Sequence, residues 1–507
     1  MTYTVKIEER DFSIPIIGNY KPDPVYLSWS AYGGPHIAHL KISGSLRSLL
    51  ETTRLLRSPV EIYADDTAPV WWGFVSEITI YFGQLKLFIS LDRLINRVKV
   101  QYSFISPDNH LADQSQTTWV DDLGSQTEFG IKEFIIHRSK IDDDFAENLR
   151  DTVLSGHAWP ETEFSQSFID ADAYALVKCS GWFETLSWKY YENLKNFYAN
   201  YGPAPGTFEF DMDSSHRRPS QIFTANANGS LQYVYFQVRK IGSPTGDLKA
   251  TVRDATNTSI GTSAIISPAS VSEDYAWLKF TFSSPPSLVS GATYKLNLFS
   301  TAINAANFYA VKTDENQGYS GGYAVYWDGA AYVNVPSITH PARKCDLIFR
   351  AVLVTDTGDQ LAAIATSGNQ FFTKIDTITS GVNTSPYRAN GYSCLREIQA
   401  LMNLGTSNNR LILASVNYFR QLEFYEQPDP KIPTVFLNDD CVFYTSLGQP
   451  LKPYNPPVGQ FAAYLGSSDL LQPFDQIKAP PAFISLVEIW PETGGVKIHS
   501  TPSHERL

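Results

Sequence analysis

The stretch WWGFVSEITIYFGQLKLFISL, residues 71–91, gives the clearest indication of secondary structure in the N-terminal region. Its aromatic and β-branched side chains are typical of strands, because they fit a pleated, half-buried surface. Gly83 divides the stretch, so the pattern predicts two strands, 71–83 and 84–91. Similar runs lie at 25–32, 36–44 and 60–66, whereas 45–58 fits either a short helix or a loop. The first hundred residues therefore predict a β-domain.

The composition predicts a mainly β protein, with some α+β character, that has several domains. Its 507 residues exceed one ordinary core, and 43% of them are hydrophobic. The 28 Tyr, 30 Phe, 31 Gly and 30 Pro suit strands and turns. The net charge is −12 and no basic run occurs, which argues against sequence-specific nucleic-acid binding, although DNA could pass through a negative lumen. No apolar run is long enough for a transmembrane segment.

Residues 103–202 combine helix and strand signals. Within 139–154, the apolar residues Phe145, Leu149 and Val153 follow three aspartates at helical spacing and predict one amphipathic helix. Residues 173–191 (AYALVKCSGWFETLSWKYY) predict two strands on either side of Gly181. A joint rich in Gly and Pro, YGPAPG, then marks a change of composition.

The segment 203–353 is rich in Ser, Thr, Gly and Asn and predicts strands at short intervals. Alternation of apolar and polar residues, as in LQYVYFQVRK (231–240), gives each strand one side that faces a core. Closely spaced strands without a helix signal predict an antiparallel β-sandwich of the jelly-roll type. The predicted strands are 230–241, 247–255, 276–284, 293–300, 307–313, 323–329 and 345–353.

From residue 354 the mixed character returns. YSCLREIQALMNLG (392–405) predicts a helix with Ser393 as N-cap and Gly405 as C-cap. Residues 410–428 predict two strands, and 482–490 predicts another. The spacing of the four cysteines matches no metal or redox motif, so we expect free buried thiols at Cys179, Cys345, Cys394 and Cys441.

Three segments outside 203–353 resemble recurring parts of phage tail baseplate-hub (tail-tip hub) proteins. In 71–102 a strand with W-G-x-V precedes the pattern S-L-D-x-x-x-N-x-V-x-V-x-Y. The matching residues are Trp72, Gly73, Val75, Ser90, Leu91, Asp92, Asn96, Val98, Val100 and Tyr102. The segments 179–191 and 405–428 are similar to a second and a third recurring part, and the order of the three supports the resemblance.

This resemblance implies a structural protein of a tailed bacteriophage, assembled in the host cytoplasm and located in the virion at the tail tip. A homotrimeric ring would adapt the six-fold tail tube to the three-fold tip. Its partners would be a distal tail or tail tube protein, the tape measure protein, and tip or fibre proteins. The implied domains are 1–102 (tube-like β hub domain, barrel or sandwich), 103–202 (mixed α+β hub domain), 203–353 (inserted domain) and 354–507 (second hub portion with a tube-like β-domain and one helix).

The segment 203–353 itself resembles the carbohydrate-binding-like jelly-roll domains of phage tail and secreted bacterial proteins. The turn KIGSPTGDL (240–248) and the strand start SGATY (290–294) carry this likeness. The resemblance implies a sandwich and, by analogy alone, a peripheral domain that binds host-surface glycan during attachment.

Sugar binding needs exposed aromatic rings beside polar groups that form hydrogen bonds. The candidate residues are Tyr319, Tyr323, Tyr326, Trp327, Asp314, Asn316 and Asp328. The alternative is that these alternating aromatic residues fill the core of the sandwich. Asp211 and Asp213 could contribute ligands to a Ca²⁺ ion in the inserted domain, or could be solvated turn residues. No other cofactor is expected.

The sequence contains no recognisable catalytic motif, so we expect no enzyme. The doublets Glu273-Asp274 and Asp314-Glu315 lack an identifiable carboxylate partner across a cleft, which a glycoside hydrolase requires. His36 and His39 are three residues apart and would point to opposite faces of a strand. Two alternatives to the hub remain. The first is a lectin-like receptor-binding protein that binds the host surface, and the second, weaker one is a polysaccharide-degrading tail enzyme.

Overall fold

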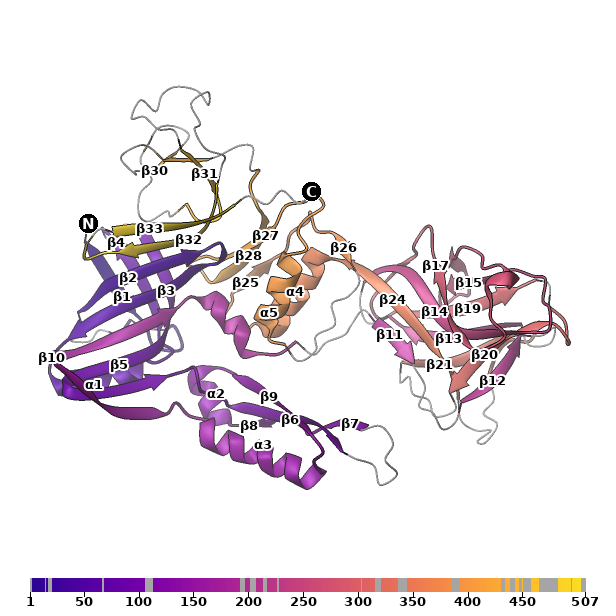
Figure 1. The fold of residues 1–507 in the computed structure, drawn as a ribbon, viewed down its shortest axis with the longest axis horizontal. Helices are drawn as coiled ribbons and strands as arrows, with labels where there is room; N and C mark the ends of the chain where they lie inside the picture. Colours follow the sequence, from indigo (N-terminus) through magenta and orange to yellow (C-terminus); the bar gives the residue numbers. More distant parts are fainter. Residues whose placement is uncertain are drawn as a thin grey trace. The chain divides into compact units, whose positions relative to one another are not determined.

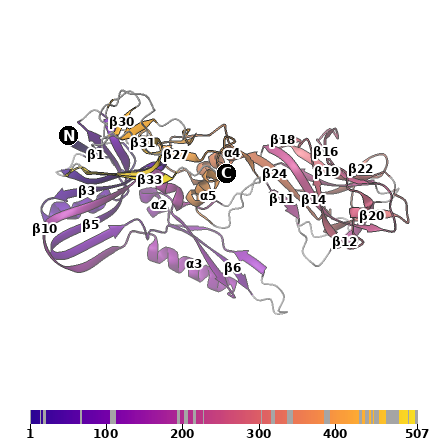
Figure 2. The ribbon, with the colours of Figure 1, turned by 45° about the horizontal axis from the view of Figure 1, so that its top comes forward.

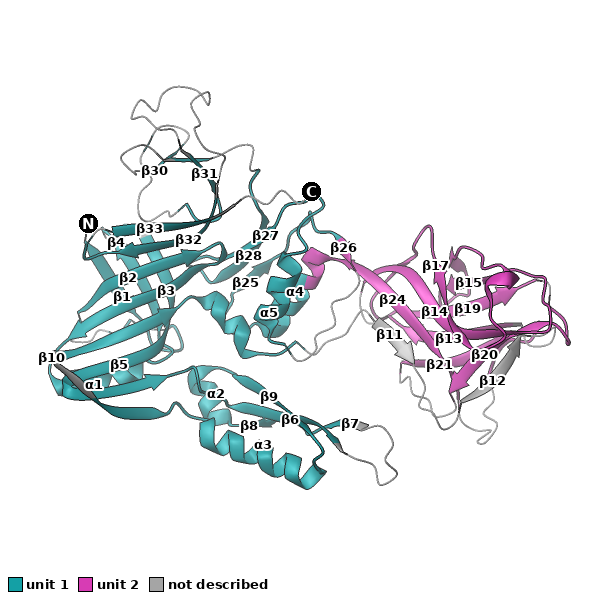
Figure 3. Cartoon of the chain, in the orientation of Figure 1, with its two compact units in different colours: residues 1–192, 361–382, 389–507 teal, residues 193–360, 383–388 magenta. Residues whose placement is uncertain are grey.

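The computed structural model describes residues 2–13, 15–16, 21–65, 68–104, 113–191, 197–200, 207–212, 217–225, 228–301, 303–314, 321–335, 344–384, 392–429, 434–437, 443–445, 449, 457–464, 482–493 and 495–502. Strands predominate among these residues, which confirms the mainly β fold class (Figure 1). The chain forms two compact units (Figure 3). Unit 1 comprises 1–192, 361–382 and 389–507, and unit 2 comprises 193–360 and 383–388. The predicted inserted segment 203–353 lies within unit 2.

Unit 1 contains a 14-stranded sheet built from both ends of the chain. Its main path runs β1-β4-β5-β10-β3-β2-β32-β31-β29-β30, and β25, β27, β28 and β33 pair beside this path. The two ends of the chain meet where β2 pairs antiparallel with β32. Among the described residues the sheet is open, so the predicted tube-like barrel is not found there. The strands are β1 (Tyr3–Ile7), β2 (Pro22–Ser30), β3 (Tyr32–Ser43), β4 (Pro59–Ala64), β5 (Ala68–Ser90), β10 (Thr162–Ser180), β25 (Lys374–Asp376), β27 (Ile412–Val416), β28 (Gln421–Glu426), β29 (Val435–Leu437), β30 (Phe443–Thr445), β31 (Phe461–Tyr464), β32 (Ala482–Trp490) and β33 (Gly495–Pro502).

The stretch 71–91 lies almost entirely in one long strand, β5, rather than in two strands. Gly83 adopts a φ of +56°, and the register with β10 shifts beside it. A glycine can take this left-handed conformation without a steric penalty, so it produces an irregularity in the strand without ending it. The strand prediction was therefore correct, and the predicted boundary at Gly83 was wrong.

In the described part of the chain, four α-helices belong wholly to unit 1 and begin at residues that their sequences favour. α1 (Leu46–Glu51) and the short 3₁₀ helix η1 (Thr52–Leu55) show that the helical alternative for 45–58 is correct. The predicted helix at 139–154 is α3 (Asp143–His157), whose N-cap Asp142 accepts a hydrogen bond from the backbone N–H of Phe145. α5 (Cys394–Met402) begins at the predicted N-cap Ser393, but its C-cap is Asn403 rather than Gly405. α2 (Leu123–Phe129) and a fifth helix, α4 (Thr357–Gly368), were not predicted.

The second strand predicted around Gly181 is instead a 3₁₀ helix, η2 (Trp182–Trp188). Gly181 packs directly on the neighbouring strand: a Cβ there would lie 1.8 Å from the carbonyl oxygen of Pro35. The aromatic and leucine side chains of η2 are buried on several sides of the turn, so the apolar pattern reflects enclosure in the core of unit 1 rather than the alternation of a strand.

A small α/β layer follows β5 in unit 1. Its four strands are β6 (Arg97–Phe104), β7 (Asp113–Gln116), β8 (Val120–Asp121) and β9 (Glu133–Ser139). α3 lies along this sheet (Figure 2), and the two share a core that includes Val98, Val100 and Ile136. This confirms that the amphipathic helix packs beside a sheet.

Unit 2 consists mainly of two antiparallel sheets around one core. Phe236 and Phe280 of one sheet and Leu296 and Leu298 of the other belong to this core, the arrangement of a β-sandwich. A short 3₁₀ turn, η3 (Pro268–Ser270), connects two strands. The nine-stranded sheet contains β11 (Phe197–Asn200), β12 (Thr207–Met212), β14 (Gly229–Ile241), β17 (Ala276–Thr281), β18 (Ser287–Leu288), β20 (Phe308–Asp314), β23 (Asp346–Leu347), β24 (Phe349–Asp356) and β26 (Asn383–Thr384). The six-stranded sheet contains β13 (Arg217–Thr224), β15 (Leu248–Arg253), β16 (Ser259–Thr262), β19 (Thr293–Ser300), β21 (Gly322–Trp327) and β22 (Tyr332–Asn334).

Candidate functional site

The aromatic residues predicted to bind sugar divide between the two faces of β21. Tyr326 packs against the core of the sandwich, as the alternative interpretation expected. Tyr323 and Trp327 lie at the opposite parity of the strand and therefore on the outer face of the six-stranded sheet. Both rings are half-buried. The structure thus places part of the predicted group on an outer surface.

The predicted polar residues are also separated. Asp314 ends β20 and is fully buried, opposite Asp346 in the register of β20 and β23. Asp328 is exposed in the turn after β21, where its carboxylate accepts hydrogen bonds from the backbone N–H groups of the turn at 2.8 Å. These bonds lower the pKa of Asp328. Tyr319 and Asn316 lie outside the described residues.

The predicted calcium ligands are not brought into a described site. Asp211 lies in β12, where its backbone is opposite Ala310, and Asp213 lies outside the described residues. Within the described part of the chain, no group of three or more His, Cys, Asp or Glu side chains could hold a metal ion.

The outer face of the six-stranded sheet combines cationic and aromatic side chains. We call this set the aromatic–basic face: Arg218, Lys249, Arg253, Lys295, Lys344, Phe299, Tyr323, Trp327 and Tyr332. Phe299 lies beneath two cations, with its ring centroid 4.9 Å from the Arg218 guanidinium carbon and 5.2 Å from the Lys249 ammonium. Lys295 lies 4.9 Å from the ring of Tyr332, which in turn packs edge-on against Trp327 at 5.2 Å. Lys344 lies 3.7 Å from the ring of Tyr323.

Asn297 of β19 lies at the centre of this face. It is fully buried, although its position in β19 is one of the outward-facing ones. Its amide nitrogen donates a hydrogen bond of 2.6 Å to the hydroxyl of Tyr332, and its Oδ1 atom has no hydrogen-bond partner. A buried carbonyl oxygen normally accepts a hydrogen bond. The unpaired oxygen therefore marks this position as a candidate contact for a ligand.

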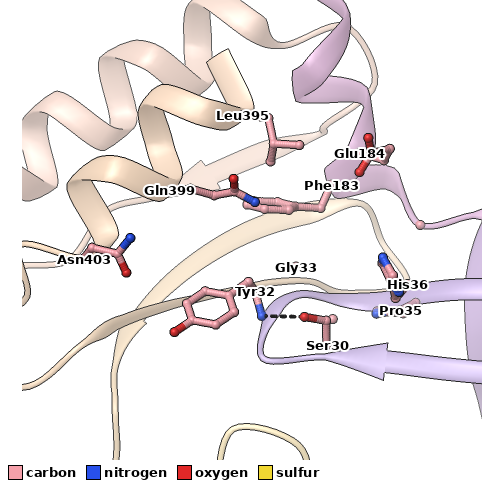
Figure 4. Close-up of a pocket in the computed structure, with 12 residues that line it drawn as sticks. Ser30, Tyr32, Gly33, Pro35, His36, Phe183, Glu184, Leu395, Gln399 and Asn403 are labelled. Carbon is pink, nitrogen blue, oxygen red and sulfur yellow. Dashed lines mark hydrogen bonds between the residues drawn. The ribbon is translucent and has the colours of Figure 1, made fainter. Parts of the chain in front are cut away.

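A pocket of about 420 Å³ lies in unit 1 between the β2–β3 turn, η2 and α5 (Figure 4). The close-up shows Gln399 and Phe183 above the turn that carries Tyr32. Gly33 lines this pocket and has a φ of +127°. Its backbone approaches Phe183 so closely that a Cβ would lie 2.6 Å from the ring. Ser30, His36 and Glu184 also line this pocket.

Those three residues are of the types that form hydrolytic triads, but their geometry differs from that of a triad. The Ser30 hydroxyl accepts a hydrogen bond from the backbone N–H of Tyr32 at 3.1 Å. No hydrogen bond joins Ser30, His36 and Glu184 to one another in this described pocket, whereas a nucleophile and its base require one. His39, which was predicted to point away from His36, packs against the ring of Tyr26, with ring centroids 5.3 Å apart.

The three hub-like segments meet in the core of unit 1. Phe74 of the first segment packs on Trp182 and Trp188 of the second, with centroid separations of 5.1 and 5.4 Å. Trp72 of the first segment donates its indole N–H to the backbone carbonyl of Val416 in the third at 2.8 Å. Residues up to 344 positions apart in the sequence are therefore in direct contact.

α5 also carries a buried carboxyl group that the sequence analysis did not identify. Glu397 is fully buried, and neither of its carboxyl oxygens has a hydrogen-bond partner. Burial raises the pKa of this carboxyl to about 7. The signal was present in the helical spacing, since Glu397 lies three residues after Cys394 and four before Leu401, both of which face the core.

The prediction of free buried thiols is confirmed for Cys179 and Cys394. Both are free and buried, Cys345 is buried, and Cys441 lies outside the described residues. None of the described helices is long and apolar enough to cross a membrane.

Comparisons with known proteins identify no family. No protein-family model matches the chain, and no curated protein matches it. Among solved structures, the chain is similar to the cysteine protease and lectin-like domains of Cwp84, a surface layer associated protein of Clostridium difficile, with 11% identity and a TM-score of 0.20 over 37% of this chain and 41% of that chain. It is also similar to a glycoside hydrolase family 43 arabinoxylan arabinofuranohydrolase from Bacillus subtilis, with 11% identity and a TM-score of 0.16 over 54% of this chain and 63% of that chain. The chain thus spans less than two thirds of both proteins, and these TM-scores are too low to establish a shared fold.

Proposed function

We propose that this chain is a structural hub protein of a bacteriophage tail tip, whose three copies form a ring between the six-fold tail tube and the three-fold tip. The observation that carries the proposal is the meeting of the three hub-like segments in one core. Phe74 touches both tryptophans of the second segment, and Trp72 bonds to the third. The three segments occur in the same order as in hub proteins, and they pack against one another. This is expected if together they form one hub-like domain.

The open sheet of unit 1 supports an assembly role. β1 and β30 end its main path among the described residues, and each has one side without a neighbouring strand on that path. An open strand edge can pair with another chain. Three copies joined by one repeated heterologous interface would close a ring, with a lumen through which the tape measure protein and DNA would pass.

Unit 2 would be the peripheral domain of this hub and would bind host-surface glycan. The pairing of strands near the two ends of unit 2 supports insertion. β11 pairs antiparallel with β24, with Phe197 opposite Val352. The start and end of the inserted chain therefore lie side by side, as is common for domains inserted into a host domain. The finer assignment of unit 2 to the jelly-roll type belongs to this proposal.

Oligomeric state and particle shape test the hub function. The full chain is purified and examined by mass photometry over a series of concentrations, and the main species by negative-stain imaging. The hub proposal expects a ring of three copies with three peripheral knobs. A monomer at every concentration, also after addition of a distal tail or tail tube protein, would count against it.

A lectin-like protein that binds the host surface is the second candidate. The aromatic–basic face and the unpaired Oδ1 of Asn297 favour it. A monomer that binds saccharide would support this second candidate, since a lectin needs no ring.

A further inference from the structure

We propose that the aromatic–basic face of unit 2 binds an acidic saccharide, a sugar chain that carries carboxylate or phosphate groups. This inference rests on the glycan-binding role proposed for unit 2 and names the class of glycan. It places the binding site across β13, β15, β19, β21 and β22, on the outer face of the six-stranded sheet, rather than within the segment 314–328 alone.

The charge of this face selects an anion. In the described strands of the face, the outward positions include Lys249, Arg253 and Lys295 but no Asp or Glu. The whole chain carries a net charge of −12, so a surface of this kind is not a consequence of composition. Lysine and arginine donors form stronger hydrogen bonds with carboxylate or phosphate oxygens than with neutral groups.

The two acidic residues nearest in sequence are committed to their own turns. Asp254 follows β15 and accepts hydrogen bonds from the Thr256 hydroxyl at 2.7 Å and the Thr258 N–H at 2.8 Å. Asp328 follows β21 and caps the backbone of its turn. These hydrogen bonds hold both carboxylates in their turns. The charge of Asp254 still acts on Lys295, and Arg253 donates a hydrogen bond of 2.6 Å to the Asn257 carbonyl, so Lys249 and Lys295 are the cations expected to contact the ligand.

The aromatic rings of the face indicate that the anionic ligand is a saccharide. Trp327 and Tyr332 pack edge to face and remain half-exposed, which provides an apolar platform for the C–H face of a pyranose ring. The ammonium of Lys295 lies 4.9 Å from the Tyr332 ring and so stands beside this platform. A sugar that stacks on the platform would therefore present an acidic substituent close to a cation.

Asn297 provides a third, independent contact. Its Oδ1 atom is buried without a partner directly beside the Tyr332 hydroxyl that its amide nitrogen contacts. A sugar hydroxyl is a donor of the kind that this oxygen lacks. Movement of the Tyr332 ring on binding would expose this oxygen. In the unbound protein the ring would therefore cover Asn297.

Unit 2 also supplies a matched control surface. On the nine-stranded sheet, Lys279 lies 4.2 Å from the ring of Tyr233, the same kind of cation–aromatic pair as Lys295 with Tyr332. The substitution Lys279→Gln removes one positive charge from the opposite sheet and leaves the proposed site intact.

Binding to the full chain is measured by isothermal titration calorimetry with three acidic probes: an oligogalacturonate, sialyllactose and a mannose 6-phosphate oligosaccharide. The methyl ester of the oligogalacturonate is the neutral control, and an oligo-dT of equal length is the nucleic-acid control. The variants are Lys249→Gln with Lys295→Gln, Trp327→Ala, and the control Lys279→Gln. Thermal unfolding checks that each variant is folded.

At least one acidic saccharide is expected to bind, while the methyl ester and the oligo-dT bind more weakly. The double lysine variant should lose affinity by about tenfold or more, Trp327→Ala by about fivefold, and Lys279→Gln not at all. The inference is overturned if the wild-type chain binds none of the acidic saccharides, if the oligo-dT binds equally well, or if Lys279→Gln lowers affinity as much as the double variant. Mass photometry of the same sample separates the two proposals: a trimer without saccharide binding overturns this inference alone, and a binding monomer overturns only the hub.

Discussion

Replacing Glu397 by glutamine should remove a large part of the pH dependence of stability. In the folded chain, burial raises the pKa of this carboxyl from its ordinary value of 4.5 to about 7. In the unfolded chain the carboxyl loses its proton near the ordinary value. Between these two pH values the folded state holds a proton that the unfolded state has released, so the stability falls as the pH rises. A displacement of this size corresponds to about 3 kcal/mol of unfolding free energy, lost by neutral pH.

Two groups beside Glu397, Tyr191 and Cys394, titrate above this window. Burial raises the pKa of the Tyr191 hydroxyl above its ordinary value of 10.0, and burial raises that of the Cys394 thiol to about 12. The neighbouring Arg396 lowers the pKa of Glu397, but by less than burial raises it. A change of stability between about pH 4.5 and pH 7 that depends on Glu397 therefore reports on its carboxyl group.

Urea unfolding followed by tryptophan fluorescence measures this effect, since Trp182 and Trp188 lie in the same core. The wild type, Glu397→Gln and Glu397→Met are compared at several pH values from about 4.5 to 7.5. Both variants should gain stability over the wild type by about 3 kcal/mol across this range, on top of any constant offset from repacking. Glu147→Gln, on the exposed face of α3, should show no such trend. A difference between wild type and Glu397 variants that stays constant with pH would refute the reasoning.

Three further predictions concern the packing of unit 1. Gly181→Ala should lower the unfolding free energy by about 3 kcal/mol or more, because the new Cβ would overlap the Pro35 carbonyl, whereas Gly156→Ala meets open space and should not; thermal unfolding of both variants tests this. Phe74→Ala should cost about 3–5 kcal/mol in urea unfolding, because it empties the contact between two hub-like segments; an equally stable variant would contradict the assigned core. Cys179 and Cys394 should resist iodoacetamide at about pH 8 in the folded chain and react after unfolding, since burial raises the pKa of both thiols and the thiolate is the reactive form; labelling of the folded chain, read by mass spectrometry, would contradict this.

Local patterns predicted most elements of the fold, because their causes are local. The alternation in 231–240 becomes β14, whose Val234, Phe236 and Val238 face the core. The N-cap of α5 was predicted because a serine hydroxyl accepts a hydrogen bond from a backbone N–H of the first helical turn. In such cases one side chain and a few neighbours determine the geometry.

The features that the sequence analysis missed depend on distant partners. The aromatic residues after Gly181 form a 3₁₀ turn because β3 and α5 enclose them, and neither neighbour is adjacent in the sequence. α4 escaped prediction because Gly, Ser and Thr interrupt its short apolar face, formed by Leu361, Ile364 and Ala365. The candidate site shows the same limit. Parity along β21 separates Tyr326 from Trp327, but only the pairing of β21 with β22, and of β13 with both β21 and β19, brings Trp327, Tyr332 and Asn297 onto one face.

The sheet of unit 1 is completed by strands from opposite ends of the chain. β2 and β32 pair directly, and the Tyr26 hydroxyl donates a hydrogen bond of 2.6 Å to Glu488, 462 positions further along the chain. Glu488 also bonds to His499 of β33, and these two hydrogen bonds lower the pKa of the Glu488 carboxyl. Unit 2 consists chiefly of the continuous segment 193–360, so most of its strands can pair before the C-terminal strands of unit 1 have been synthesised. Unit 1 cannot complete its sheet until β32 reaches β2, because β2 has an unpaired edge until then. The order of the elements therefore allows the inserted domain to fold first and makes the sheet of unit 1, the body proposed to build the ring, the last part to close.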